Sequence, residues 1–344
     1  MHFEQPPAPH APPRDSVPRI MRRVLVALVP AAGCHVWFFG PGLLVNFVLA
    51  AAAGLAAESA ILAMRGRSSA SQLRDGSALV TAALLAFSLP PLLPFWVPVT
   101  GAVVAIVLAK QLYGGLGKNP FNPAMVGFAV LLVSFPVDMT RWLPPHMGDI
   151  DYRALGVGEH LRYVLTAKLP AAVEIDALTR ATPLDFVKEG LRAGRSYAEL
   201  RGYSLIGDFG GRGWEWVADF VALGGLYLLY TRTIRWHTPT AFMAGLLLPA
   251  TALYLAGPTS FAPPWFHLFS GGAMLGAFFI ATDPVSSATT PRGRLVYGAG
   301  IGFLVYALRT WGGYPDGVAF AVLLMNAAVP LIDRYTRPRI YGHA

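Results

Sequence analysis

The sequence predicts an all-α protein that crosses a membrane many times. Hydrophobic residues make up 54% of its 344 residues, charged residues only 13%, and its mean hydropathy is +0.49. Soluble domains carry roughly 25% charged residues. Residues 77–109 contain no charged side chain at all. Long apolar runs of this kind are typical of polytopic membrane proteins.

Ten apolar segments are predicted as membrane spans. They cover residues 24–39, 42–64, 77–93, 95–109, 124–137, 217–230, 240–256, 265–282, 295–308 and 318–332. Several are shorter than the ~20 residues that a straight span needs. The third and fourth segments also contain Pro90, Pro91, Pro94 and Pro98. Proline-interrupted segments occur in membranes where protein covers their unpaired backbone groups, so we expect broken helices here.

The distribution of Lys and Arg predicts the orientation. With both ends of the chain in the cytoplasm, sixteen of the 27 cations fall in cytoplasmic segments and only Arg309 falls in a short outside loop. The other ten lie in the long loop 140–215, beside ten acidic residues, and long loops cross membranes largely regardless of charge. The net charge of +8 therefore lies on the cytoplasmic rim. There it is explained by the membrane topology and by contact with anionic lipids, and it does not indicate nucleic-acid binding.

This topology divides the chain into five parts. We expect a disordered cytoplasmic tail, a first five-span repeat, an outside loop, a second five-span repeat and a cytoplasmic C-terminal tail. Their ranges are 1–19, 20–139, 140–215, 216–333 and 334–344. Five spans per half implies inverted halves if the gene was duplicated. The string FAVLL occurs at both 128–132 and 320–324, and GSAL at 76–79 loosely matches GAML at 272–275.

The redox chemistry open to this chain is limited by its single cysteine, Cys34. One thiol excludes an internal disulfide and a four-cysteine cluster supplied by this chain alone. His35 and His267 are the only histidines within the predicted spans, and no further signal points to a haem between them. We expect no metal site. Electron transfer would need an organic cofactor or a partner's cluster.

The outside loop contains the string DALTRATPL at residues 176–184. Residues 185–195 have helical composition, so Thr182 is predicted at the N-cap and Pro183 in the first turn, where a missing N–H does no harm. A threonine cap before proline is ordinary by itself. The longer string of an acid, a hydroxyl residue and Ala-Thr is not required by folding.

Two further strings lie on the predicted cytoplasmic side. In GGLGKNPFNPA, at residues 114–124, the amides of Asn119 and Asn122 can bond an imide edge and Phe121 can stack on a ring. The alternative is a Gly/Pro-rich turn capped by asparagine. In ATDPVSS, at residues 281–287, Asp283 can accept a hydrogen bond from a ligand or cap a turn. Under the inverted-repeat interpretation the two strings are neighbours.

Glu58 lies deep in the second predicted span. An intramembrane carboxylate indicates an ion or proton path by default. The alternative is an ion pair with Lys110 or with a partner protein.

Together these strings resemble the NqrB/RnfD family, which comprises the D component of Rnf complexes and the B component of the sodium-pumping NADH:quinone oxidoreductase. The resemblance runs nearly end to end and includes residues 115–136, 176–184, 224–229, 268–284, 309–317 and 333–335. The Ala-Thr-Pro-Leu form of the loop string favours the Rnf member over the Nqr one. Ala177 and Arg180 depart from the family's usual small residues.

The resemblance implies a flavoprotein. FMN would be esterified through its phosphate to Thr182 of the acid-x-x-Ser/Thr-x-Ala-Thr string, which here consists of Asp176, Thr179, Ala181 and Thr182. A noncovalent riboflavin would lie near Asn119, Phe121, Asn122 and Asp283. The fold would resemble the urea-transporter-like inverted repeats.

The resemblance also implies partners and an activity. The chain would be one component of a ferredoxin:NAD+ oxidoreductase in the bacterial inner membrane, active only within the whole complex. It would couple electron transport to translocation of Na+ or H+. Its partners would be the other Rnf subunits, RnfA, RnfB, RnfC, RnfE and RnfG, with the FMN-bearing RnfG exchanging electrons with it at the periplasmic face. The alternatives are a solute or ion channel or transporter of the same fold, and a passive assembly component.

Overall fold

A computed structural model describes residues 16–66, 73–146, 155–169, 175–314 and 316–337, and the side chains of Asp176 and Ala177 lie outside what it describes. Within these residues the protein is helical, and pairing between extended segments is limited to two isolated bridges. The predicted all-α class is therefore confirmed for the described part of the chain.

The first half contains five helical segments and a short helix. They are α1 (Val17–Phe39), α2 (Gly42–Met64), α4 (Ser77–Ser88), α5 (Trp96–Val104) continued by the π-helix η1 (Ala105–Gln111), α6 (Pro123–Ser134) and α7 (Pro136–Met139). Helix α1 begins seven residues before the predicted span and includes part of the predicted tail; residues 1–15 of that tail lie outside the described residues. The third span was predicted to residue 93, but the helix ends at Ser88, before the prolines that cannot donate a backbone hydrogen bond.

The described residues of the loop 140–215 form four helices, and the second half of the chain follows. The loop contains α8 (Val157–Thr166), α9 (Ile175–Leu178), α10 (Pro183–Arg192) and α11 (Tyr197–Leu200). The second half contains α12 (Trp214–Tyr230), α13 (His237–Ala256), α14 (Pro264–Phe269), α15 (Ala273–Leu275) continued by the π-helix η2 (Gly276–Ile280), α16 (Pro291–Trp311) and α17 (Val318–Thr336). The predicted span 265–282 is therefore a broken helix, interrupted between α14 and α15.

The two halves share one hydrophobic core. Helix α1 packs on α12, and α6 packs on α17, while α13 and α16 form the closest helix pair. Glycines make that closeness possible. A Cβ at Gly302 would lie 2.1 Å from the carbonyl oxygen of Phe242, and one at Gly245 would lie 2.2 Å from that of Ala299. Small residues at such contacts let membrane helices approach each other, where van der Waals packing stabilises them.

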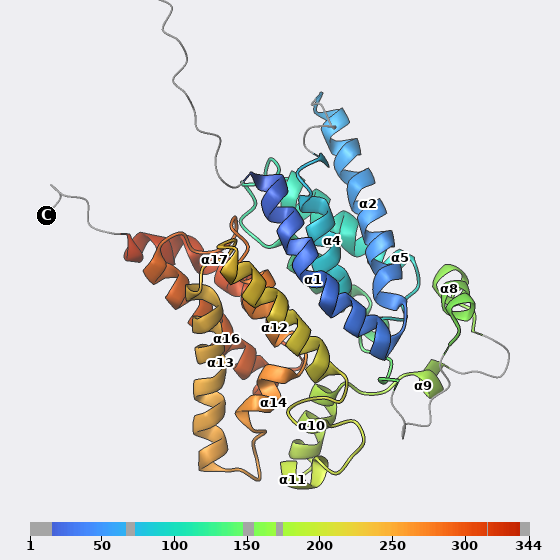
Figure 1. Cartoon of the computed structure of the whole chain (residues 1–344), viewed down its shortest axis with the longest axis vertical. Coiled ribbons are helices and arrows are strands. Elements are labelled where there is room, and N and C mark those ends of the chain that lie inside the picture. The colour runs from blue at the N-terminus through green and yellow to red at the C-terminus, as the bar shows by residue number, and fades with distance from the viewer. Residues whose placement is uncertain (1–15, 67–72, 147–154, 170–174, 315, 338–344) are drawn as a thin grey trace, which may run out of the picture.

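The start of α1 and the end of α17 lie towards one end of the molecule, and α10 and α11 lie at the other (Figure 1). Helices α10 and α11 are held there by a separate apolar cluster, in which Leu184, Val187 and Leu200 pack with Phe266 of α14. A third cluster joins Leu178 of α9 to Leu92. The loop helices thus form a lid attached to the broken segments of both halves.

Four of the described helices are long and apolar enough to cross a membrane: α1, α2, α13 and α17. The apolar helices at 77–88, 96–111 and 123–134 are shorter. This agrees with a bundle whose half-length segments are covered by the full-length ones.

The contact between α13 and α16 generates a prediction. Gly302→Val inserts a branched side chain where the backbones touch, and overpacking of this kind costs typically 1–3 kcal/mol. We expect a lower midpoint of thermal unfolding in detergent micelles. Gly33→Ala in α1 is the matched control, because nothing lies within 4 Å of its added Cβ and alanine favours a helix. Equal midpoints for the two variants would contradict the packing described.

Candidate functional site

Thr182 is the N-cap of α10, as predicted. Its hydroxyl accepts a hydrogen bond from the backbone N–H of Asp185 (3.1 Å) and donates one to the Asp185 carboxylate (2.8 Å). Pro183 occupies the first helical position. Burial raises the pKa of Asp185, and the hydroxyl of Thr182 partly opposes that rise. The hydroxyl is half-buried and lies at the positive end of the helix.

The start of α10 is fixed from two sides. Pro183 lies against Gly211, where an added Cβ would approach the proline ring to 2.2 Å. Leu184 lies against Gly271 in the break before α15; Gly271 has φ +62°, so the same turn needs glycine for conformation and for space. The cap of α10 is therefore positioned by both the loop before α12 and the broken helix.

The other members of the predicted loop string are placed as follows. The backbone of Asp176 lies in α9, and its side chain is outside the described part. Thr179 donates a hydrogen bond to the carbonyl of Ile175 (3.2 Å), while Ala181 is exposed. Arg180 donates its N–H to the carbonyl of Trp142 (2.9 Å) in an isolated bridge. Of the described residues of the string, Thr182, Pro183 and Leu184 line the cavity described next, whereas Thr179, Arg180 and Ala181 do not.

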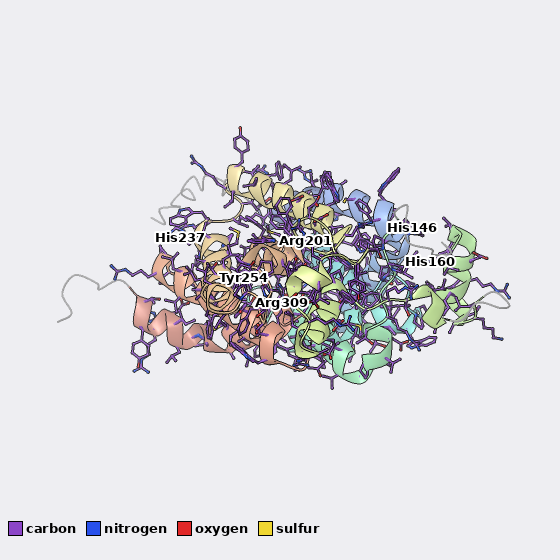
Figure 2. The ribbon with its side chains drawn as sticks, turned by 90° about the horizontal axis from the view of Figure 1, so that it is seen from below. His146, His160, Arg201, His237, Tyr254 and Arg309 are labelled. Carbon is purple, nitrogen blue, oxygen red and sulfur yellow. The ribbon has the colours of Figure 1, made fainter. Side chains whose placement is uncertain are left out.

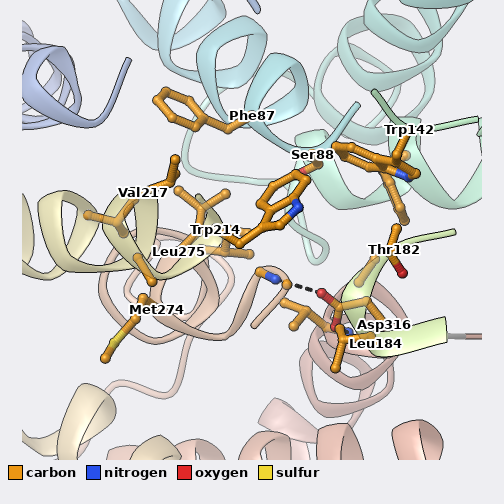
Figure 3. Close-up of a pocket in the computed structure, with 18 of the residues that line it drawn as sticks. Phe87, Ser88, Trp142, Thr182, Leu184, Trp214, Val217, Met274, Leu275 and Asp316 are labelled. Atoms are coloured by element: carbon orange, nitrogen blue, oxygen red, sulfur yellow. Dashed lines mark hydrogen bonds between the residues drawn. The ribbon is translucent and has the colours of Figure 1, made fainter. Parts of the chain in front are cut away.

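Thr182 lines an outer cavity of about 1160 Å³ between the two halves of the protein. Helices α4, α6, α12, α15 and α17 contribute its walls, and most of its lining is apolar or aromatic. Figure 3 shows Trp142 and Trp214 between Phe87 on one side and Thr182 on the other. The two indoles form an edge-to-face pair with centroids 5.1 Å apart. Neither tryptophan was among the site residues predicted from the sequence, although both line this cavity.

One cavity wall depends on Arg309, the single cation predicted in a short outside loop. Its guanidinium is buried and donates to the carbonyls of His267 and Ser270 (3.1 Å to the latter), and it pairs with Asp316 (3.2 Å). Asp316 in turn accepts from the backbone N–H of Gly272 (2.6 Å), the contact drawn in Figure 3. This Arg309 clamp satisfies both ends of the break between α14 and α15.

The histidines do not gather at this clamp. Viewed from the α10 end, His146 and His160 lie on the side of α8, and Arg309 lies among the C-terminal helices (Figure 2). Among the described residues no group of three His, Cys, Asp or Glu side chains is arranged to hold a metal ion.

An inner cavity of about 810 Å³ lies at the opposite end of the same helices. It is lined by Asn119, Asn122 and Asp283. The Asn122 amide donates to the carbonyl of Ile280 (3.4 Å). Residues of both strings, 114–124 and 281–287, line this cavity, so the two strings are neighbours, as predicted. Each string directly follows a π-helix, an element found frequently at functional sites.

The predicted inner residues differ in what their side chains do. Asn122 caps α6 by accepting from the N–H of Met125 (3.3 Å), and Asp283 accepts from Val285 (3.2 Å) and Ser286 (2.7 Å). Both therefore have the structural roles named as alternatives. The Oδ1 atom of Asn119 is buried without a hydrogen-bond partner. Phe121 does not line this cavity, and its predicted stacking role is not supported by its position.

Glu58 and Lys110 form a buried ion pair. Their charged atoms are 2.6 Å apart and both side chains are almost fully buried. Lys110 also donates to the hydroxyl of Ser77 (2.6 Å), and Gln111 donates to Glu58 (2.7 Å). The predicted alternative, pairing with Lys110, is therefore present. Lys110 was counted among the cations of the cytoplasmic rim, but it lies inside the protein and lines the inner cavity.

Comparison with known proteins identifies the family. The model of the NQR2, RnfD, RnfE family matches residues 5–342. The chain belongs to the NQR2, RnfD, RnfE family. Similar members include proteins named as the D subunit of an ion-translocating oxidoreductase complex from Shigella dysenteriae serotype 1 and Escherichia coli O1:K1, each 49% identical, and from Salmonella arizonae, 50% identical. Each alignment covers 100% of this NQR2, RnfD, RnfE family member and 99% of the relative.

The buried ion pair of this family member generates a prediction. Glu58→Gln leaves the Lys110 ammonium uncompensated, and Lys110→Met leaves the carboxylate. Breaking a buried pair in this way costs about 3–5 kcal/mol. The double variant removes both charges, so we expect its loss of unfolding free energy in detergent to be smaller than the sum of the two single losses.

The control for this cycle is the exposed pair Arg192 and Glu189 (3.2 Å). Glu189→Gln should change stability by less than about 1 kcal/mol, since solvent screens such pairs. If the losses from Glu58→Gln and Lys110→Met simply add, the two side chains do not stabilise each other.

Proposed function

We propose that this protein is a membrane component of an Rnf-type ion-translocating oxidoreductase complex, and that it relays electrons through FMN esterified to Thr182. The near-complete alignment with relatives named as the D subunit of such a complex supports the assignment to the complex. The observation that carries the flavin assignment is the Thr182 hydroxyl at the mouth of a large aromatic cavity. When bound, FMN supplies the electron-transfer chemistry, and the protein supplies position and dielectric.

The residues present fit this group. The first backbone N–H groups of a helix and its dipole favour a phosphate, and Thr182 stands at that point of α10. The aromatic walls formed by Trp142, Trp214 and Phe87 suit a flat ring. The hydroxyl–carboxylate bond to Asp185 would be lost on esterification, because the oxygen then has no proton to donate. Asp185, whose pKa burial already raises, would be further favoured in its neutral form beside the added negative charge.

The inner cavity is proposed to hold a noncovalent riboflavin. Asn119 supports this, because its buried Oδ1 has no partner within the protein and an imide N–H would satisfy it. Asp283 lines the same space, although its carboxylate already accepts two hydrogen bonds from its own turn.

Glu58 is proposed as a member of the path for the translocated ion, Na+ or H+. The ammonium of Lys110 occupies the position beside Glu58 where a cation would bind. The second carboxylate oxygen of Glu58 is buried without a hydrogen-bond partner. A carboxylate with one unpaired oxygen can bind a proton or cation that reaches it. While no such ion is bound, the ammonium of Lys110 neutralises the charge of Glu58.

The proposed membrane arrangement has ten segments as two inverted repeats in the inner membrane, with residues 140–215 in the periplasm and both ends in the cytoplasm. Four helix contacts support it. Helix α1 packs on α12, and α6 packs on α17, so helices in corresponding positions of the two halves meet. Within the halves, α5 contacts α6 just as α16 contacts α17. The position of α10 at the end opposite the start of α1 supports the orientation (Figure 1). RnfG, with its own FMN, is the proposed electron partner on that side.

Thr182→Val tests the tether. We expect the chain, produced together with the flavin-attaching enzyme, to lose its fluorescent band in a denaturing gel, and its intact mass to fall to that of the unmodified polypeptide. Thr182→Ser retains a hydroxyl and should retain fluorescence. Thr166→Val is the matched control, because Thr166 lies in α8 of the same loop but outside the string, and it does not line the cavity. An unmodified wild-type mass would remove the basis of the redox assignment.

Asn119→Leu tests the inner flavin. We expect the flavin released from the complex by denaturation, measured by chromatography, to drop by about one equivalent, while the covalent fluorescence at Thr182 is unchanged. Phe121→Leu is the control, since Phe121 lies outside the cavity lining. Release of equal amounts from Asn119→Leu and wild type would place riboflavin elsewhere or nowhere in this protein.

A further inference from the structure

His35 is a buried side chain whose hydrogen-bonding groups are unused. It lies in α1 and is 1% exposed, and neither Nδ1 nor Nε2 has a hydrogen-bond partner among the residues that the structure describes. Leaving a buried polar group unpaired is unfavourable, and such groups in native proteins call for an explanation. His35 thus points to a missing partner.

The surroundings of His35 indicate where that partner would lie. Its ring contacts Phe39, Phe87 and Trp214, with centroids 5.0, 6.3 and 6.1 Å away. None of these neighbours accepts a hydrogen bond in the plane of the imidazole ring. The remaining neighbour is the outer cavity, which His35 lines. A partner for the imidazole would therefore be a molecule inside that cavity.

The cavity changes character along its length. Thr182 and Asp316 make one part polar, and Phe87, Trp214 and the neighbouring apolar residues make the other part aromatic (Figure 3). Asp185, which is hydrogen-bonded to Thr182, also lines the cavity. A ligand attached at Thr182 with a polar chain and a flat heteroaromatic ring matches this division. His35 belongs to the aromatic part through its contacts with Phe87 and Trp214.

We propose that His35 donates a hydrogen bond to the pyrimidine edge of the flavin ring tethered at Thr182, and that it sets the flavin's redox potential. This rests on the proposed FMN attachment. Neutral imidazole carries one N–H donor, and the carbonyl oxygens and N1 of that edge are acceptors. Reduction adds electron density to those atoms, so a donor there stabilises the reduced form more than the oxidised form. His35 therefore raises the potential of this flavin.

The test compares His35→Phe, His35→Gln and wild type as full-length chains produced with the flavin-attaching enzyme. Fluorescence of the denatured band first measures how much flavin each chain carries. Spectroelectrochemical titration then gives the potential. For His35→Phe we expect full flavin loading. At the wild-type midpoint potential we expect the ratio of reduced to oxidised flavin to fall approximately tenfold. This fall corresponds to a reduction potential lower by 59 mV for a one-electron couple and by about 30 mV for a two-electron couple. Gln retains an N–H donor and should restore most of the potential.

His267→Phe is the matched control. His267 is also buried in a membrane segment and its Nδ1 also lacks a partner, but it does not line the outer cavity. Its replacement should leave the potential of the tethered flavin unchanged. A resonance Raman band of the flavin carbonyls provides a second readout, because it should shift to higher frequency in His35→Phe and not in His267→Phe.

The outcomes separate the two proposals. Fully loaded His35→Phe with a wild-type potential and carbonyl band would overturn the role of His35 and leave the tether at Thr182 intact; water would then be the partner of the imidazole. A wild-type chain without covalent flavin would instead overturn the attachment itself. If His35→Phe does not fold, the carbonyl band is compared in wild type and His35→Gln, each in H2O and in D2O. A band at the same frequency in both chains, with no shift in D2O, would equally refute the hydrogen bond.

Discussion

The guanidinium of Arg309 is the interaction on which the outer half of the molecule depends. A helix that stops within a membrane protein leaves carbonyl and N–H groups that lipid cannot satisfy. Arg309 binds the carbonyls at the end of α14, and through Asp316 it reaches the N–H of Gly272 at the start of the next helix. The same turn bears against Leu184 of α10. One buried cation therefore links the helix break, a cavity wall and the cap that presents Thr182.

In the inner half, side-chain amides rather than a charged group bind the unpaired backbone groups of the broken segments. Asn326 donates to the carbonyl of Ser286 (2.9 Å) and accepts from the N–H of Asn122 (3.0 Å), and Asn122 binds the carbonyl of Ile280. These bonds hold the starts and ends of broken segments from both halves together. The inner cavity is lined by amides, by the Asp283 carboxylate and by one paired cation, Lys110, and the outer cavity has the carboxylates of Asp185 and Asp316 at its polar end.

The sequence was sufficient for the parts that local chemistry determines. Apolar run lengths predicted the helical segments, the Thr-Pro pair predicted the cap at Thr182, and Asn122 and Asp283 were expected near each other from the repeat alone. It did not predict which side of an apolar helix faces protein. Helix α2 is apolar all around, so no periodicity shows that Glu58 points to Lys110. The positions of His35, Trp214 and Phe121 depend in the same way on packing between distant segments.

The engaged state of the Thr182 hydroxyl has a consequence for biogenesis. An enzyme that esterifies this oxygen must first detach it from Asp185, and it must reach a side chain held at a junction between α10, the turn before α12 and the broken helix. A polypeptide whose lid has not yet docked offers the same hydroxyl without these obstacles. Under the proposed attachment, loading of the cofactor would therefore be favoured early in maturation, before these helices pack against the rest of the protein, and their packing would then enclose the attached group.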